Sequence, residues 1–305
     1  MKENKIIDSE AVITGIVKEA MSRTGNPRLK QVMELLVEHA HAFIREANLT
    51  DAELEAGLDF IGRIGQANSD DHNEVILASD VLGISTLVAY RNNPQDQGQS
   101  AAALLGPFWR DGSPDCKCGD NIARSETPGI ATFVKGAVRN IAGVPMENVT
   151  VDIWQASPVG LYENQDPNQA NMNLRGKFRT DAQGKYHFRT VRPAGYPVPT
   201  HGPIGELLRA QNRNPYRPAH IHFMVSAPGY KTLITQVFAD DSEHLYSDVV
   251  FGVTKPLIGH LQFHEHHDQP TPEYPDAPPL DGYFTLTYDF VLEEGESTFP
   301  RPPIK

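Results

Sequence analysis

From about residue 130 to the end, the chain is a series of short runs rich in β-branched and aromatic residues. Gly, Pro, Asn and Asp separate these runs. Many short strands with frequent turns are typical of an antiparallel sandwich or barrel. We therefore expect strands at residues 133–140, 148–156, 184–191, 219–227, 232–239, 248–254 and 283–292. Trp154 and Tyr186 are expected in the core of that sandwich.

Residues 1 to about 95 carry a helical pattern instead. Asn26 can cap a helix that starts at Pro27, and Thr50 with Glu53 forms a capping-box pattern for a second helix. A third helix is expected in residues 72–92, which are apolar almost all round and should therefore be buried. Apolar residues of the first of these helices recur on one face at steps of three and four: Leu29, Val32, Met33, Leu36, Ala40, Phe43 and Ile44.

The strand-rich and the helical sequence patterns together predict an α+β chain with two domains. Residues 1–100 would form a helical N-terminal dimerisation domain, and residues 101–305 an antiparallel β-sandwich catalytic domain. Residues 94–128, rich in Gly, Ser, Asp and Pro, would connect them. We expect this connection to be ordered, because its LLGPFW run would otherwise expose several large apolar groups.

Charge and the absence of targeting signals narrow the function. The 305 residues include 27 basic and 39 acidic ones, a net charge of −12, which argues against nucleic acid or an anionic membrane as the main partner. No run approaches the roughly 18 apolar residues of a membrane span, and the start MKENKIIDSEAV lacks the apolar core of a signal peptide. A cytoplasmic protein is expected. Cys116 and Cys118 are too close in sequence for an unstrained disulfide and are interpreted as free thiols.

The run RPAHIHFMV places two histidines in a buried strand. Side chains alternate faces along a strand, so His220 and His222 project together while Ile221 and Phe223 point the other way. Two convergent imidazoles on a rigid strand can form half of a first-row metal site. A pair of histidines on a polar sheet face is the competing interpretation of this motif alone.

Two tyrosines favour the metal interpretation. Tyr162 follows a strand and a Pro-Val-Gly turn, and Tyr196 lies between Gly195 and Pro197, so neither belongs to a core stripe. A tyrosinate is a hard oxygen ligand with an ordinary pKa near 10. Only a strongly acidic metal would keep it ionised at neutral pH, which ferric iron fits better than zinc or magnesium.

The chain resembles the intradiol ring-cleaving dioxygenases over essentially its whole length. The resemblance rests on DIWQASPVGLY, RTVRPAGYPVPTHGP and RPAHIHFMVSAPGYKTLITQVF, in that order, and on the helical N-terminal part and LLGPFWR. It implies one Fe(III) per subunit, with Tyr162, Tyr196, His220 and His222 as ligands. Tyr196 and His222 would be the axial pair, and Tyr196 would leave the metal and help to take a proton from the diol.

The resemblance also implies supporting residues. Arg217 would lie over the substrate and stabilise the developing anion, and Gln236 would support the site from the next strand. A structural ion pair for Arg217, and a strand glutamine satisfied by backbone for Gln236, are the competing accounts. The pocket would be lined by Leu77, Asp80, Leu105, Gly106, Pro107, Phe108, Val198, Pro199 and Arg217.

The helical N-terminal part points to the catechol branch of the family, and the chain most resembles the members that cleave hydroxyquinol. Asp80 lies in an apolar run, and a buried carboxylate there needs a partner, which a third substrate hydroxyl would supply. The expected product is 3-hydroxy-cis,cis-muconate or maleylacetate. Cleavage of catechol or a chlorocatechol to cis,cis-muconates is the alternative, with Asp80 capping a helix or pairing with an arginine.

The resemblance implies a homodimer built through the N-terminal helices, which in this family often surround a bound phospholipid. The apolar positions in VMELLVEHAHAFI fit that arrangement and fit packing onto the β domain equally well. Two other classes of function fit the sequence less well. A non-catalytic β-sandwich binding protein is disfavoured because all four ligands, Arg217 and Gln236 are present, and a zinc hydrolase because two ligand positions hold tyrosine. His201 could lie near the pocket or in a turn. Four histidines near the C-terminal end of the β region are interpreted as part of a solvated loop rather than as a zinc site: His260, His264, His266 and His267.

Overall fold

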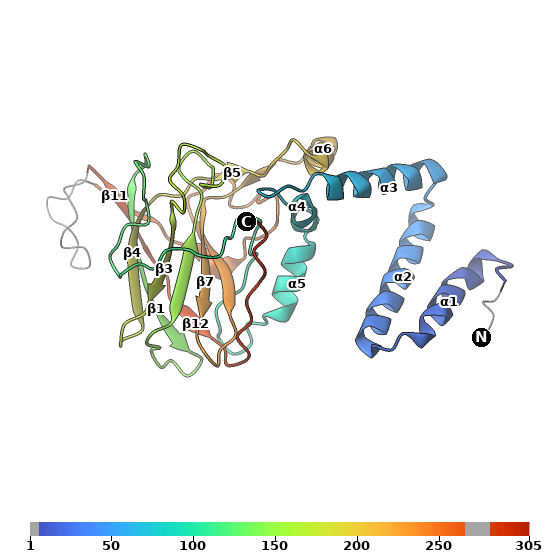
Figure 1. Ribbon diagram of the computed structural model, residues 1–305, viewed down its shortest axis with the longest axis horizontal. Helices are drawn as coiled ribbons and strands as arrows, with labels where there is room; N and C mark the ends of the chain where they lie inside the picture. The colour runs from blue at the N-terminus through green and yellow to red at the C-terminus, as the bar shows by residue number, and fades with distance from the viewer. Residues whose placement is uncertain (1–5, 266–280, 305) are drawn as a thin grey trace. The chain divides into compact units, whose positions relative to one another are not determined.

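The computed structural model of the chain describes residues 6–265 and 281–304, and the chain divides into two compact units, residues 1–62 and 63–305. The domain boundary at residue 100 stays a prediction. His266 and His267 lie outside the described residues. The helices of the N-terminal part are α1 (Glu10–Ala20), η1 (Met21–Arg23), α2 (Pro27–Ala47) and α3 (Asp51–Gln66), the last of which crosses the boundary between the units (Figure 1).

The expected helix starts are confirmed by their hydrogen bonds. The Asn26 side chain accepts from the Leu29 N–H at 3.0 Å, which satisfies a free donor in the first turn of α2. The Thr50 N–H donates to the Glu53 carboxylate at 2.9 Å, and the Glu53 N–H donates to Thr50 Oγ1 at 3.3 Å. This reciprocal pair is a capping box that starts α3.

The apolar face of α2 is not covered within its own unit. No residue of α2 is buried, and Leu36 and Phe43 are 58% and 59% exposed. Among the described residues, no helix is both long and apolar enough to cross a membrane. The face predicted from the three- and four-residue steps is therefore an exposed apolar surface on this single chain.

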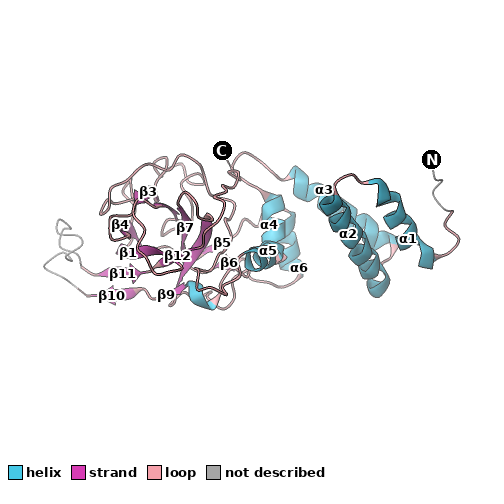
Figure 2. Ribbon diagram, turned by 90° about the horizontal axis from the view of Figure 1, so that it is seen from below, coloured by secondary structure: helices cyan, strands magenta, loops and turns pink. Residues whose placement is uncertain are grey.

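The third expected helix is two helices, α4 (Glu74–Val81) and α5 (Ile84–Asn92). Gly83 separates them with a φ of +70°, a conformation that ends a helix and that glycine adopts without penalty. The expected burial is right for α4, whose Leu77 and Asp80 are buried, and wrong for α5, which has no buried residue. In Figures 1 and 2, α4 lies beside both α5 and α6 (Pro203–Ala210).

Two five-stranded sheets form the rest of the second unit. The first contains β1 (Ala131–Asn140), β4 (Lys185–Val191), β10 (Gln262–His264), β11 (Tyr283–Thr287) and β12 (Phe290–Leu292). The second has the order β3-β2-β7-β8-β9, with β2 (Thr150–Trp154), β3 (Arg175–Arg179), β7 (His220–Ser226), β8 (Leu233–Ala239) and β9 (Ile258–Gly259). The remaining elements are the ribbon of β5 (Tyr196–Pro197) with β6 (Tyr216–Arg217), and η2 (Lys255–Leu257).

The sheets are mixed, so the expectation of a strictly antiparallel sandwich is wrong. β1 runs parallel to β11 and β12, and β8 runs parallel to β9. The cause is connectivity, because β11 is far from β1 in the sequence and the chain can return to run beside β1 in the same direction. β12 follows β11 after a break of two residues and continues the pairing along the later part of β1. Where β11 gives way to β12, a Cβ at Gly136 would lie 1.7 Å from the Tyr288 carbonyl oxygen, so this approach requires glycine.

The strand expected at residues 248–254 is also wrong, because this stretch is irregular. The Asp248 carboxylate accepts from the N–H of Gly252 at 2.9 Å and of Val250 at 3.4 Å. These bonds fold the backbone into a local turn and compete with pairing in a sheet. Five of the other six expected strands are confirmed, and the one expected at residues 283–292 is two strands, β11 and β12.

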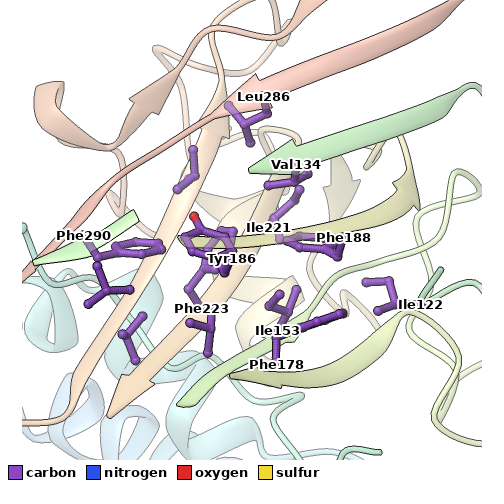
Figure 3. Packing of buried hydrophobic residues seen from close by; sticks show 14 of the residues in the cluster. Ile122, Val134, Ile153, Phe178, Tyr186, Phe188, Ile221, Phe223, Leu286 and Phe290 are labelled. Atoms are coloured by element: carbon purple, nitrogen blue, oxygen red, sulfur yellow. The ribbon is translucent and has the colours of Figure 1, made fainter. Parts of the chain in front are cut away.

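The main core lies between the two sheets (Figure 3). It includes Val134, Tyr186, Phe188, Leu286 and Phe290 from the first sheet and Ile153, Phe178, Ile221, Phe223 and Val237 from the second. The expected core position of Tyr186 is confirmed. On β7 the core takes every second residue, so the residues between them face away from the first sheet.

Candidate active site

The outer face of the second sheet carries a row of four buried side chains in register. Arg175 pairs with Trp154, Trp154 with His222, and His222 with Gln236 across β3, β2, β7 and β8. All four are at most 1% exposed. Because cross-strand partners lie on the same face, the row joins four polar or aromatic groups that loops shield from solvent.

His220 and His222 meet through their Nε2 atoms, which are 3.1 Å apart. His220 Nδ1 is 2.7 Å from the Pro218 carbonyl oxygen, which only accepts, so Nδ1 carries the proton and Nε2 a lone pair. Trp154 stacks on the His222 ring, with centroids 4.7 Å apart and planes at 12°. The predicted projection of both histidines to one face is confirmed, with Ile221 in the opposite core.

Two loops bring the tyrosines to this point. Tyr162 follows β2 and Tyr196 begins β5, and their hydroxyl oxygens are 3.2 Å apart. Tyr162 packs against Phe108, with ring centroids 4.5 Å apart, and Tyr196 lies beside His220 at 5.6 Å. The structure thus places two phenol oxygens and two imidazole nitrogens, from segments 60 residues apart, in one buried cluster.

Arg217 is fixed beside the cluster by three groups. Its Nη1 is 3.1 Å from His220 Nε2, its Nη2 donates to Gln236 Oε1 at 2.8 Å, and its Nε donates to Asp248 at 3.2 Å. Gln236 Nε2 donates in turn to the Leu104 carbonyl at 2.6 Å. Both competing accounts of Arg217 and Gln236 therefore describe real contacts, and the same contacts aim the guanidinium at the cluster.

Burial controls protonation here. Burial, followed by the charge of Arg217, holds the pKa of His220 well below its usual range, and burial likewise lowers the pKa of His222. Both rings are therefore neutral, the form that binds metals. Burial raises the pKa of Tyr162 and of Tyr196. Without a cation both phenols keep their protons, so any ion that holds them as phenolates must be strongly acidic.

Comparisons with known proteins identify the family. The family profile described as "Dioxygenase" matches residues 105–294, and that described as "Catechol dioxygenase N terminus" matches residues 26–100. A 6-chlorohydroxyquinol 1,2-dioxygenase of Cupriavidus pinatubonensis is 39% identical over 280 residues, covering 92% of this chain and 96% of the relative. The chain belongs to the intradiol ring-cleavage dioxygenases.

Two further relatives agree with this dioxygenase assignment. A catechol 1,2-dioxygenase of Candida albicans is 38% identical over 259 residues, covering 84% of this chain and 86% of the relative. The crystal structure of a hydroxyquinol 1,2-dioxygenase from Pseudomonas putida DLL-E4 superposes with a TM-score of 0.85 at 38% identity, covering 94% of this chain and 99% of that one. Members of this family use iron.

The donor set of the dioxygenase fits an iron ion. Two ligands at right angles, each about 2.1 Å from a metal, are about 3 Å apart, close to the spacings within the histidine pair and within the tyrosine pair. The described residues contain no group of three or more His, Cys, Asp and Glu side chains that could hold a metal. A metal at the cluster therefore needs the tyrosine oxygens, which favours ferric iron over zinc.

The residues predicted to line the substrate pocket are all buried or half-buried, and two of the loop residues among them approach the cluster of tyrosines and histidines directly. Phe108 contacts Tyr162, and a Cβ at Gly106 would lie 3.3 Å from the His222 ring, so this glycine lets the loop approach the cluster. Asp80 is buried, and burial raises its pKa to about 6. Leu77 and Val198 are also buried, and Leu105, Pro107 and Pro199 are half-buried.

Neither alternative account of Asp80 is supported by a contact. Its carboxylate forms no salt bridge in the described part of the chain, and the cap of α4 is Asn73. Burial has the largest effect on the pKa of Asp80 and raises it. A hydrogen bond with Ser85 and the charge of Arg217 lower this pKa, whereas the charge of Asp248 adds to the effect of burial. Asp80 therefore lies close enough to the arginine of the cluster to interact with it electrostatically.

Several side chains have other positions than expected. Trp154 is buried, but in the outer cluster with Tyr162 and Tyr196 rather than in the sandwich core. His201 is exposed. His260 contacts Asp240 at 2.5 Å and His264 contacts Thr285 at 2.8 Å. The expected free thiols are confirmed for Cys116 and Cys118.

Sequence reasoning missed Asp248, which holds Arg217, and the buried pair of Glu163 and Arg175 behind Tyr162. Asp248 gives no sequence signal, because it begins an apolar run that resembles a strand. Glu163 directly follows a candidate ligand, but its partner is twelve residues away along a variable loop. Only the register of β2 and β3 brings that arginine to the cluster.

Proposed function

We propose that this enzyme cleaves hydroxyquinol, benzene-1,2,4-triol, between its two adjacent hydroxylated carbons with O2. The product would be 3-hydroxy-cis,cis-muconate or its tautomer maleylacetate. The observation that carries the proposal is a buried cluster in which two phenol oxygens lie 3.2 Å apart and two imidazole nitrogens 3.1 Å apart, with the Tyr196 and His220 ring centroids 5.6 Å apart. One Fe(III) per subunit, held by Tyr162, Tyr196, His220 and His222, would activate the bound diol toward O2.

The chain's own groups would handle protons and charge. Burial raises the pKa of Tyr196, so its phenolate form would be a strong base that could take the proton of a substrate hydroxyl and become the neutral phenol. Arg217 carries a permanent charge, because Asp248 raises its pKa against the opposing effect of burial. That guanidinium, fixed at three points, would stabilise negative charge developing on the ring oxygens. Phe108 and Trp154 would keep water from the reacting carbons.

Asp80 supports the triol over a simple catechol. It is buried, it forms no salt bridge in the described part of the chain, and its pKa near 6 leaves it able to accept a hydrogen bond at neutral pH. A third ring hydroxyl would give the carboxylate a hydrogen-bond partner in addition to Ser85, whereas catechol would leave it with Ser85 alone. The relatives that act on hydroxyquinols support the same choice, and catechol or a chlorocatechol is the alternative substrate.

The test is the visible spectrum of the iron-loaded protein. Tyrosinate bound to Fe(III) gives a broad charge-transfer band, which should shift when hydroxyquinol is added without oxygen. Asp80→Asn should lower kcat/KM for hydroxyquinol more than for catechol, by roughly tenfold or more. A colourless iron-loaded protein would remove the tyrosines from the ligand set, and equal losses on both substrates would make Asp80 a purely structural residue.

The same proposal includes a homodimer. The exposed apolar residues of α2, among them Leu36 and Phe43, form a face that a second copy of the chain would cover. Light scattering should give twice the 33.7 kDa chain mass. Leu36→Glu with Phe43→Glu should give a monomer, and a monomeric unmodified protein would overturn this part of the proposal.

A further inference from the structure

A second arginine, Arg175 on β3, is completely buried and forms an ion pair with Glu163. Its Nε donates to Glu163 Oε2 at 2.8 Å, and the other oxygen of Glu163 accepts from Arg110 Nη1 at 2.8 Å. Glu163 directly follows Tyr162. One carboxylate therefore joins the tyrosine loop to β3 and to the loop that contains Phe108.

The Arg175 guanidinium also lies against the tyrosine itself. Its central carbon is 5.9 Å from the centre of the Tyr162 ring, and its Nη1 and Nη2 have no hydrogen-bond partner among the described residues. A buried guanidinium with two free N–H groups is costly unless nearby electron density compensates it. The electron-rich Tyr162 ring and Glu163 are the groups in position to do so.

The charge is placed closer to the tyrosine than to the histidines. Arg175 is in register with Trp154, and Trp154 with His222, so the β3 and β7 backbones are two strand spacings, about 10 Å, apart. Trp154 lies between the guanidinium and the His222 ring. A change of charge at Arg175 therefore acts first on the Tyr162 phenol.

We propose that Arg175, held by Glu163, is a positioning residue that sets how strongly Tyr162 donates electrons to the iron. The proposal rests on the proposed function, because it takes Tyr162 as an iron ligand. Arg175 does not touch substrate. Its positive charge lowers the energy of the phenolate electrons, and the Glu163 carboxylate opposes that effect and fixes the guanidinium in place.

Opposite charge changes should move the phenolate-to-iron band in opposite directions. Arg175→Met removes a positive charge beside the phenolate, which raises the donor energy and moves the band to longer wavelength. Glu163→Gln removes the opposing negative charge, which lowers the donor energy and moves the band to shorter wavelength. A role in packing alone gives no reason for this reversal of sign.

The experiment records visible spectra and iron content of the full-length, iron-loaded protein and its variants. Arg192→Met is the matched control, since Arg192 also lies over an aromatic ring, 4.4 Å from the Phe284 centroid, and pairs with a carboxylate, Asp241 at 2.8 Å. Its band should stay in place. Arg175→Lys keeps the charge and should restore most of the original band position.

A further variant protects the test against misfolding. Glu163→Gln combined with Arg175→Met removes both charges together, avoids an uncompensated buried ion, and should return the band close to its original position. Shifts of Arg175→Met and Glu163→Gln in the same direction, or no greater than that of Arg192→Met, would overturn the proposal. If Arg175→Met does not fold, the band position of Glu163→Gln is compared with that of the double variant. A return of the band toward longer wavelength in the double variant then supports the proposal, and no return overturns it.

Failure of this proposal is distinguishable from failure of the proposed function. An iron-loaded unmodified protein without a charge-transfer band removes Tyr162 as a ligand, and both proposals fall. An unmodified protein with the band, and charge variants that leave it in place, removes only the role of Arg175.

Discussion

The two faces of β7 are equally buried and chemically different. Facing the first sheet, β7 presents Ile221 and Phe223 to an apolar core, and facing away it presents His220 and His222 to a polar cluster. The inner face is stabilised by packing against a neighbouring sheet. The outer face is covered by loops whose side chains supply ion pairs and hydrogen bonds. One strand thus separates the residues that hold the fold from those that carry the chemistry.

The largest expected effect tests the inner face. Phe223 is fully buried, between Tyr186 and Phe290, so Phe223→Ala leaves a cavity in the core. The free energy of unfolding should fall by about 3–5 kcal/mol, measured by urea titration of the metal-free protein. The folded fraction should keep its substrate selectivity. A loss below about 1 kcal/mol would show that the two sheets repack around the gap.

Tyr162→Phe tests the outer face in the opposite way. It removes one oxygen, which in the described part of the chain hydrogen-bonds to the Tyr196 hydroxyl, so metal-free stability should change by no more than about 1 kcal/mol. Ring cleavage, followed as O2 uptake, should fall by more than about 100-fold, with loss of iron or of colour. Normal turnover by this variant would place the iron elsewhere.

The buried carboxyl of Asp80 should make the free energy of unfolding depend on pH. Because burial raises its pKa to about 6, the folded protein keeps this proton where the unfolded chain, with an ordinary pKa near 4, has lost it. Its contribution to stability is therefore present at low pH and is lost as pH rises through about 4 to 6, by up to about 3 kcal/mol. Asp80→Asn should lack this loss, so its stability relative to the unmodified protein should increase over that range. A constant difference from pH 4 to 7 would contradict the shifted pKa.

The smallest effect is expected at the edge of the cluster. Gln236→Leu removes an acceptor from Arg217 and a donor from the Leu104 carbonyl, while Asp248 still holds the guanidinium. We expect kcat to fall about tenfold, with iron still bound. Gln236→Glu keeps the acceptor and provides the matched comparison. Equal activity of the leucine variant and the unmodified enzyme would leave Asp248 as the sufficient anchor.

The sequence predicts the features that depend on local patterns and misses those that depend on pairing between distant segments. Alternation along β7 predicts which residues share a face, and local hydrogen bonds at Asn26 and Thr50 predict where helices start. The parallel partners of β1 and the contacts of Asp248 depend on long-range connections that leave no local pattern. Gly83 breaks a helix that its apolar neighbours would otherwise continue. The four candidate ligand residues were predicted through their motifs, whereas the pair of Glu163 and Arg175 required the register of β2 and β3.

The pairing of β1 has a consequence for synthesis of the chain. Its parallel partners, β11 and β12, are about 150 residues later, so β1 must wait for nearly the whole chain before its ladder is complete. Such distant pairing slows folding, because a long loop must close before any contact rewards it. While a ribosome is still translating, β1 can pair only with β4 and leaves one edge open. The final 25 residues therefore act as a closing step, and nascent chains that end before β12 should be degraded or aggregate rather than accumulate as a folded domain.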